Sequence, residues 1–346
     1  IVLVLLLELR PTERLDVNYL RTFPGADLAI RLDGLSLAFA VVMLATAAGL
    51  MLARLQTRAD RRDPWRGWLL TVAAALLAIL AGNLLLVYIA FQVLTLAWSG
   101  ALDETAPRTR SLRLAHQAGD VALLVAAAVA IRSSGTSAFA GMPSDTIGPL
   151  VFLLLLVPVA TRVAAAALAP LPPAGTVAFL PAIAWLAPGG ALLFRILSLT
   201  AGRPLDQPVQ VAVFVAAVAV AVGLILVARS LETWLRFALT LIAAQAAVAL
   251  GLGVLQNPLA TISAAWVGLQ LIPLAGLVSI EPRPASSARS IATLSLGLLP
   301  PSAAFLGIWL AIAAGGRSRA AGLVLALLAA LTILAIARQL SLPRPG

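Results

Sequence analysis

Residues 148–170 read GPLVFLLLLVPVATRVAAAALAP, an apolar run with a single charge, Arg162, well inside it. A helix that spans a bilayer needs about 20 predominantly apolar residues, and this run has that length. A charge inside such a span is either a functional group or one whose long side chain reaches back to the interface. About eight residues, or roughly 12 Å of helix, separate Arg162 from Pro170, so both interpretations stay open.

The composition of the whole chain extends this interpretation to all 346 residues. Hydrophobic residues make up 61% and charged residues 11% of the chain, and its mean hydropathy is +1.02. Soluble domains carry roughly 25% charged residues. We therefore predict an all-α fold, a polytopic membrane helix bundle in a single transmembrane domain, residues 1–346, with no separate soluble domain.

We expect about eleven full spans and an N-terminal stub, residues 1–9. The stub reads as the tail of an apolar helix of a truncated chain, since the charged segment and cleavage site of a signal peptide are absent. A polar connection, residues 10–32, follows it. The predicted spans are 33–53, 67–82, 84–101, 114–131, 148–170, 176–199, 208–228, 231–254, 259–280, 291–314 and 320–340.

The net charge of +10 comes from 24 basic residues, all of them arginine. Alternating the spans places fourteen arginines in the loops of one side and eight in those of the other. By the positive-inside rule the fourteen-arginine side, which includes residues 54–66 and 108–113, is cytoplasmic. We expect an integral protein of the bacterial cytoplasmic (inner) membrane.

Several kinds of chemistry are excluded. Without cysteine there are no disulfides, iron–sulfur clusters or thiolate zinc sites, and the single histidine, His116, cannot hold a metal alone. We find no phosphate-binding glycine loop, no HExxH motif, and no basic face interleaved with aromatics for nucleic acid. The sequence predicts no catalytic, cofactor or metal site of its own, and no nucleic-acid partner.

Polar residues within the spans are the candidate functional residues. Asp120 is the carboxylate that lies most clearly inside a span, and we predict that it pairs with Arg162, Arg195 or another protein donor. His116 precedes Asp120 by four residues, on the same helix face. The two residues form either a proton relay or, more plainly, an interfacial histidine capping a packed aspartate.

The remaining candidates have simpler interpretations. Arg195 lies near a helix end, where its side chain is expected to reach the interface. Gln92, Gln245 and Gln270 do not titrate and are expected to hydrogen-bond between helices.

Prolines within the spans are a further feature, since a broken helix in a membrane often marks an ion or substrate pathway. They occur at Pro158, Pro181, the 188–190 Pro-Gly-Gly run, Pro273 and the 300–301 Pro-Pro pair. Simple kinks in packed helices are the alternative.

Four motifs, in order, resemble a known family. Residues 31–40, RLDGLSLAFA, look like the [R/V]-x-D-G-L-S-x-x-F signature of the antiporter-like membrane subunits of respiratory complex I, Mrp-type cation/proton antiporters and membrane-bound hydrogenases. Residues 83–95 resemble the family's NLLLLFxxWELxxLxS segment, 118–120 its RxGD segment, and 298–305, LLPPSAAF, its GxPPxxGF segment.

The resemblance implies a bundle of two inverted five-helix repeats, each with a broken helix, here roughly 67–199 and 208–340. It also implies a row of buried lysines and a glutamate that carries protons or cations along the membrane, because such groups can switch charge when a neighbour changes.

Carried over residue by residue, that row of titratable groups is missing. The glutamate of the WEL segment falls on Gln92, and the lysine of the first broken helix falls on Arg162. The next lysine falls near Pro188, while Gly190 and Arg195 match the family.

The second half departs in the same way. The family's HAxxKA segment falls around 264–270 and offers only Gln270, and the lysine after PPxxGF is replaced by Gly307 and Ile308. Arginine, unlike lysine, effectively never loses its proton.

The resemblance therefore implies a membrane-arm subunit of a complex I-like assembly, of the NADH:quinone oxidoreductase or hydrogenase type. Its own proton path would be degenerate, and its role structural or one of modified conduction through Asp120, His116 and water. Its partners would be other membrane subunits and the lipid bilayer. The alternatives are the membrane subunit of a stand-alone Mrp-type antiporter or inorganic-carbon transporter, or an unrelated secondary transporter.

Overall fold

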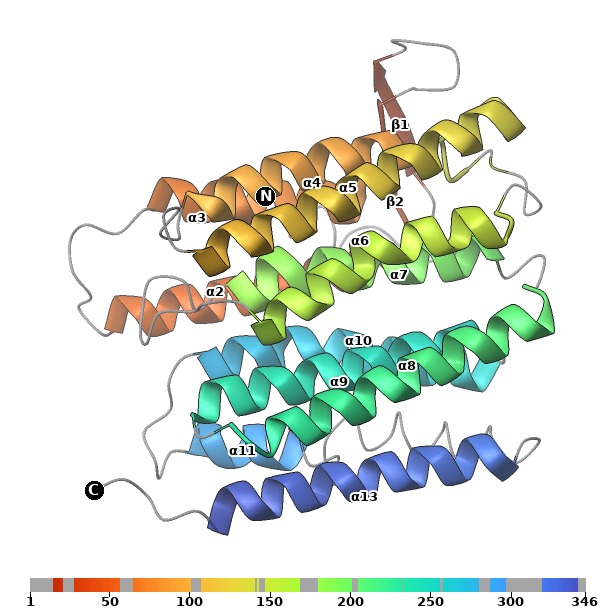
Figure 1. The fold of residues 1–346 in the computed structure, drawn as a ribbon. Coiled ribbons are helices and arrows are strands. Elements are labelled where there is room, and N and C mark those ends of the chain that lie inside the picture. The colour runs from red at the N-terminus through yellow and green to blue at the C-terminus, as the bar shows by residue number, and fades with distance from the viewer. Residues whose placement is uncertain are drawn as a thin grey trace. The chain divides into compact units, whose positions relative to one another are not determined.

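The computed structural model describes residues 15–20, 28–56, 65–100, 107–140, 142, 147–168, 180–200, 205–231, 233–255, 258–279, 287–296 and 319–341. The chain divides into two compact units, Ile1–Asp206 and Gln207–Gly346. In each unit the helices run alongside one another, as Figure 1 shows. The predicted helical class is confirmed.

The first unit consists of a small β-ribbon and a helical bundle. Its elements are β1 (Leu15–Leu20), β2 (Leu28–Leu32), α2 (Gly34–Gln56), α3 (Trp65–Leu80), α4 (Leu84–Ser99), α5 (Pro107–Ser134), α6 (Pro149–Leu168), the π-helix η2 (Leu180–Leu186) and α7 (Ala187–Thr200). β1 and β2 pair in antiparallel fashion, Leu15 opposite Leu32. The sequence predicted only a polar connection here, because two strands of five and six residues are too short for their alternation to stand out.

The π-helix η2 is the centre of this bundle. All seven of its residues are buried, and it contacts α2, α3, α4 and α6 before it continues into α7. Pro181 and Pro188 lie within this continuous helical run, and α6 continues through Pro158. These prolines therefore do not end the helices in which they lie.

Backbone hydrogen bonds join three connections at one end of the first unit. The amide of Gly82 donates to the carbonyl of Ala29, the amide of Phe139 donates to Gly82, and the amide of Leu84 donates to Ser137. A Cβ at position 82 would lie 2.7 Å from the carbonyl oxygen of Ala29, so the close approach requires glycine. Strand β2, the turn before α4 and the segment after α5 therefore share one side of the bundle.

The second unit has α9 at its centre. Its helices are α8 (Gln207–Ala228), α9 (Trp234–Val254), α10 (Pro258–Ser279), α11 (Ser287–Leu296) and α13 (Arg319–Ser341). α9 packs against α8, α10 and α11, and α13 packs against α8 and α11. α10 continues through Pro273, while the 300–301 proline pair lies outside the described residues.

Six of the described helical segments are long and apolar enough to cross a bilayer: Gly34–Ala53, Thr109–Ser134, Leu180–Thr200, Gln207–Ala228, Trp234–Val254 and Leu323–Leu340. Four shorter apolar helices accompany them, Gly67–Leu80, Leu84–Ser99, Pro149–Ala165 and Val267–Val278. Large apolar side chains such as Leu96, Leu150 and Leu323 are exposed, as on helices that face lipid. The protein is an integral membrane protein.

Candidate intramembrane polar site

A buried ion pair joins α5 and α6 in the first unit. Nη2 of Arg162 donates to Oδ1 of Asp120 at 2.8 Å, and neither side chain is exposed. The predicted pairing of Asp120 with Arg162 is confirmed. Arg162 does not reach the interface, so the interpretation of this residue as a side chain extending to the membrane surface is wrong.

A glycine on α5 allows this pair to form. A Cβ at Gly119 would lie 2.6 Å from Oγ1 of Thr161 and 3.0 Å from Cα of Pro158. Small residues allow membrane helices to approach closely. Because Gly119 immediately precedes Asp120, this contact sets the carboxylate against the guanidinium of the neighbouring helix.

Two consecutive residues of α4 complete the site. Nε2 of Gln92 donates to Oδ2 of Asp120 at 3.3 Å, and Cζ of Arg162 lies 3.4 Å from the ring centroid of Phe91. Nη1 of Arg162 also donates to the carbonyl of Pro158 at 3.4 Å. The site thus brings together three of the predicted residues, Gln92, Asp120 and Arg162, from three helices.

The chemistry of this cluster follows from its residue types. The guanidinium and the carboxylate neutralise each other's charge in an environment where an isolated charge would be very costly. The amide of Gln92 cannot ionise, and arginine does not release its proton in proteins. The cluster is suited to holding α4, α5 and α6 together and poorly suited to passing protons along its own side chains.

His116 lies one turn before Asp120 but belongs to a separate aromatic cluster. Its ring centroid is 5.2 Å from that of Trp98 on α4 and 6.4 Å from that of Trp185 on η2, and the two indoles are 5.9 Å apart. His116 is 1% exposed, and in the described contacts it does not bond to Asp120. The interpretation of His116 as a cap of the aspartate is therefore wrong.

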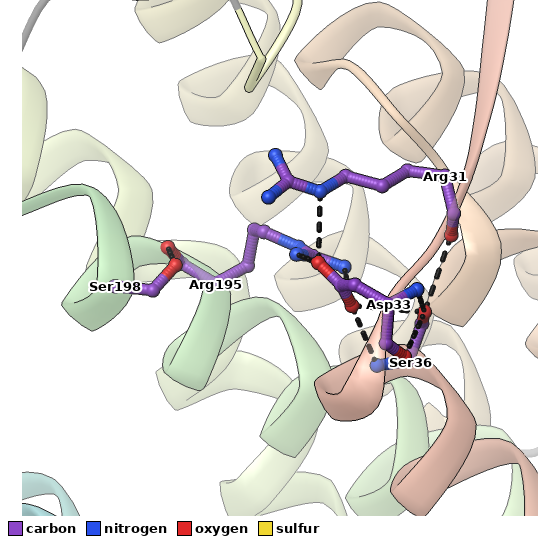
Figure 2. Close-up of polar contacts among 5 residues, drawn as sticks. All are labelled: Arg31, Asp33, Ser36, Arg195 and Ser198. Atoms are coloured by element: carbon purple, nitrogen blue, oxygen red, sulfur yellow. Dashed lines mark hydrogen bonds and ion pairs between the residues drawn. The ribbon is translucent and has the colours of Figure 1, made fainter. Parts of the chain in front are cut away.

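Arg195 on α7 forms a second ion pair. Both its terminal nitrogens donate to the carboxylate of Asp33, the Nη2 bond measuring 3.1 Å, and Nε of Arg31 donates to the same carboxylate at 2.8 Å, as Figure 2 shows. Arg195 is only 5% exposed. Its guanidinium binds Asp33, which directly precedes the α2 span, so the expectation that Arg195 reaches the interface stays a prediction.

Asp33 also caps α2. Its Oδ1 accepts the amide of Ser36 at 3.0 Å, and Oγ of Ser36 accepts the amide of Asp33 at 2.9 Å. This reciprocal pair satisfies amides at the helix start. Burial opposes ionisation of Asp33, but the hydrogen bond and charge of Arg195, with smaller effects of Ser36 and Arg31, hold its pKa well below its ordinary value.

The two glutamines of the second unit behave differently from each other. Nε2 of Gln245 on α9 donates to the carbonyl of Leu296 at the end of α11 at 3.0 Å, which is the predicted hydrogen bond between helices. Both amide atoms of Gln270 on α10 are buried, and neither has a hydrogen-bond partner among the described residues.

The polar residues do not gather into a metal centre in the part of the chain that the structure describes. Among the described residues, no three histidine, cysteine, aspartate or glutamate side chains lie close enough to hold a metal ion.

Sequence reasoning missed Asp33, Phe91, Trp98 and Trp185 as parts of these sites. Asp33 carried a signal, since it lies in the RLDGLS motif and directly precedes a span, which is the position of a helix cap. The three aromatic residues carried none, because apolar rings are common throughout membrane helices.

Comparisons with solved structures show which fold this is. The chain superposes on a chain of the Mrp complex from Dietzia sp. DQ12-45-1b with a TM-score of 0.79 at 19% identity, over 98% of its own length and 42% of that chain. On a chain of the archaeal membrane-bound sulfane sulfur reductase it superposes with a TM-score of 0.76 at 18% identity, over 97% of its own length and 63% of that chain. On a chain of respiratory complex I from Thermus thermophilus it superposes with a TM-score of 0.70 at 18% identity, over 100% of its own length and 83% of that chain.

This chain therefore spans less than two thirds of the Mrp and sulfane sulfur reductase chains that it matches. No protein-family model and no curated protein matches the sequence. The chain shares its fold with chains of these three complexes, and the Mrp complex and respiratory complex I are among the assemblies whose subunits its motifs resemble.

Proposed function

We propose that the chain is a membrane-arm subunit, or part of one, of a complex I-like proton-translocating assembly, and that its own proton path is degenerate. The observation that carries this proposal is the Asp120/Arg162 pair with Gln92 beside it. At the two positions where the resemblance implies a titratable glutamate and lysine, the chain has an amide and a permanent cation.

The two compact units support the proposed repeats. Their boundary, between Asp206 and Gln207, falls in the gap between the repeats proposed at 67–199 and 208–340. The helices from α3 to α7 would form the first repeat and those from α8 to α13 the second, with about eleven spans in all. The assembly would lie in the bacterial cytoplasmic membrane, with other membrane subunits as partners.

The role that remains for the subunit is structural, or one of modified conduction that uses Asp120, His116 and water. A buried ion pair that joins neighbouring helices holds the helices of the subunit together, and the folded subunit is what assembles into the complex. An active site of its own is not part of the proposal.

The proposal is tested by Arg162→Ala in the intact assembly. The variant leaves Asp120 buried without its partner, so the amount of assembled complex should fall. Protons pumped per turnover by the complex that does assemble should stay unchanged. Arg229→Ala, at an exposed arginine, is the matched control and should alter neither quantity. Normal assembly together with abolished pumping would show that Arg162 belongs to a working proton path.

A second candidate is the membrane subunit of a stand-alone Mrp-type cation/proton antiporter or of an inorganic-carbon transporter. The superposition on the Mrp chain over 98% of this chain supports the antiporter. Purifying the native complex and identifying its subunits separates the candidates. Quinone-reducing or hydrogenase-like partners would support the first and exclude the second.

A further inference from the structure

Buried polar atoms without protein partners lie along the seam between α4 and α5 and on the neighbouring α6 and η2. Among the described residues, no hydrogen-bond partner exists for Oγ1 of Thr95, Nε1 of Trp98, Nε2 of His116, Nε1 of Trp185 or Nε of Arg162. Each of these side chains is at most 2% exposed. A buried polar atom left unsatisfied costs about 1–3 kcal/mol, and buried indole nitrogens usually have a partner.

The side chains that carry these atoms lie at successive levels of the bundle. Gln92 meets Asp120, and Trp98 meets His116, so α4 and α5 run antiparallel with polar side chains facing each other at two successive levels. On α4, Thr95 lies one turn from each of Gln92 and Trp98, between the two levels. On α5, four residues separate His116 from Asp120, which is roughly 6 Å along the helix axis.

The aromatic rings cannot satisfy these nitrogens by themselves. Trp98 and Trp185 are nearly perpendicular, at 84°, so one indole N–H can point at the face of the other ring. Such a contact is worth only a fraction of an ordinary hydrogen bond. It leaves the second indole, His116 and Thr95 unsatisfied.

We propose that this seam binds a short chain of water molecules that links the Asp120/Arg162 pair to the ring nitrogens of His116, Trp98 and Trp185. Water both donates and accepts, so it satisfies the hydroxyl, the two indoles and the imidazole at once, and buried waters typically make about three such bonds. The chain runs from the ion pair toward the end of α4 at Ser99, on the side that the arginine bias predicts to be cytoplasmic.

His116 is the group in this series that can exchange a proton with water at either ring nitrogen. The water chain therefore marks where a modified conduction path would run. This part of the inference rests on the proposed function. The water site lies beside Gln92 and Arg162, the positions at which the resemblance implies glutamate and lysine. Its own residues, such as His116 and Trp98, are not matched by the motifs to those titratable groups.

Solid-state NMR that transfers magnetisation from water to the protein tests the site. The probe is water itself, and the sample is the protein in lipid bilayers with ¹⁵N-labelled histidine, tryptophan and alanine. His116 is the single histidine, so its ring signals need no assignment by mutation. Trp98→Phe and Trp185→Phe assign the two indole signals among seven tryptophans.

The ring nitrogens of His116 and both indole N–H groups should receive magnetisation several-fold faster than the backbone amides of Ala126 and Ala130. These two residues of α5 are fully buried and serve as the dry reference. Transfer to His116 at the rate of the alanine amides would show a dry seam and overturn the inference. That result would leave the proposal of a membrane subunit unaffected, because the measurement detects water and not ion flux.

Discussion

At the scale of single residues, the two ion pairs of the first unit differ in what surrounds them. The Asp120/Arg162 pair is fully buried, while the side chain of Asp33 is 17% exposed and has a second cation, Arg31, beside it. Breaking a fully buried pair leaves an uncompensated charge, and replacing both partners by apolar residues removes the desolvation cost. The two pairs should therefore respond differently to mutation and to pH.

For the buried pair we predict that Arg162→Ala lowers the free energy of unfolding by about 3–5 kcal/mol. The double variant Arg162→Met with Asp120→Leu should recover most of this loss or exceed the stability of the wild type. Thermal unfolding of the purified protein in lipid nanodiscs measures both. A double variant as unstable as the single one would mean that the hydrogen bonds to Gln92 and Pro158 carry the stability.

For the Asp33/Arg195 pair we predict a stability that depends on pH. The folded pKa of Asp33 lies below its ordinary value of 3.8, so its contribution is present above that pH. It is lost as the pH falls from 3.8 through the lowered pKa of the folded state. Asp33→Asn should make the melting temperature less dependent on pH in this window. Equal pH profiles for the wild type and Asp33→Asn would contradict the prediction.

At the scale of the helices, close approach between α5 and α6 positions the site. Gly119→Ala would force a Cβ against Thr161 and Pro158, so we predict a loss of about 1–3 kcal/mol from overpacking. Gly49→Ala on α2 is the matched control, because a Cβ at that position would meet nothing within 4 Å, and helix propensity should make the change neutral or slightly stabilising. Denaturation in detergent compares the two. A neutral Gly119→Ala would show that α5 and α6 can separate without cost.

At the scale of the whole molecule, the arginine bias predicts which side of the membrane each loop faces. The chain has no cysteine, so single substitutions report accessibility directly. Ser230→Cys should react with a membrane-impermeant thiol reagent from the cytoplasmic side, and Ser133→Cys from the opposite side. Both side chains are exposed in the structure. Labelling of both from one side would overturn the alternation of spans, and the reversed pattern would overturn the orientation.

Much of the helical architecture could be predicted from the sequence, because each apolar run of bilayer length must satisfy its backbone hydrogen bonds internally. The ends of α4 and α8 agree with the predicted spans to within two residues. α5 begins seven residues earlier than predicted, since Pro107 can start a helix and the arginines that follow it are good helix formers.

The sequence by itself determined that the chain is a membrane helix bundle and that Gln92 and Arg162 cannot exchange protons as glutamate and lysine do. These are properties of composition and of side-chain chemistry, which need no partner. Only the tertiary structure decided that Arg162 pairs with Asp120, that Arg195 pairs with Asp33, and that His116 meets two tryptophans. Partner choice depends on how closely helices approach and in which register, and small residues such as Gly119 set that register through contacts between helices that periodicity does not encode.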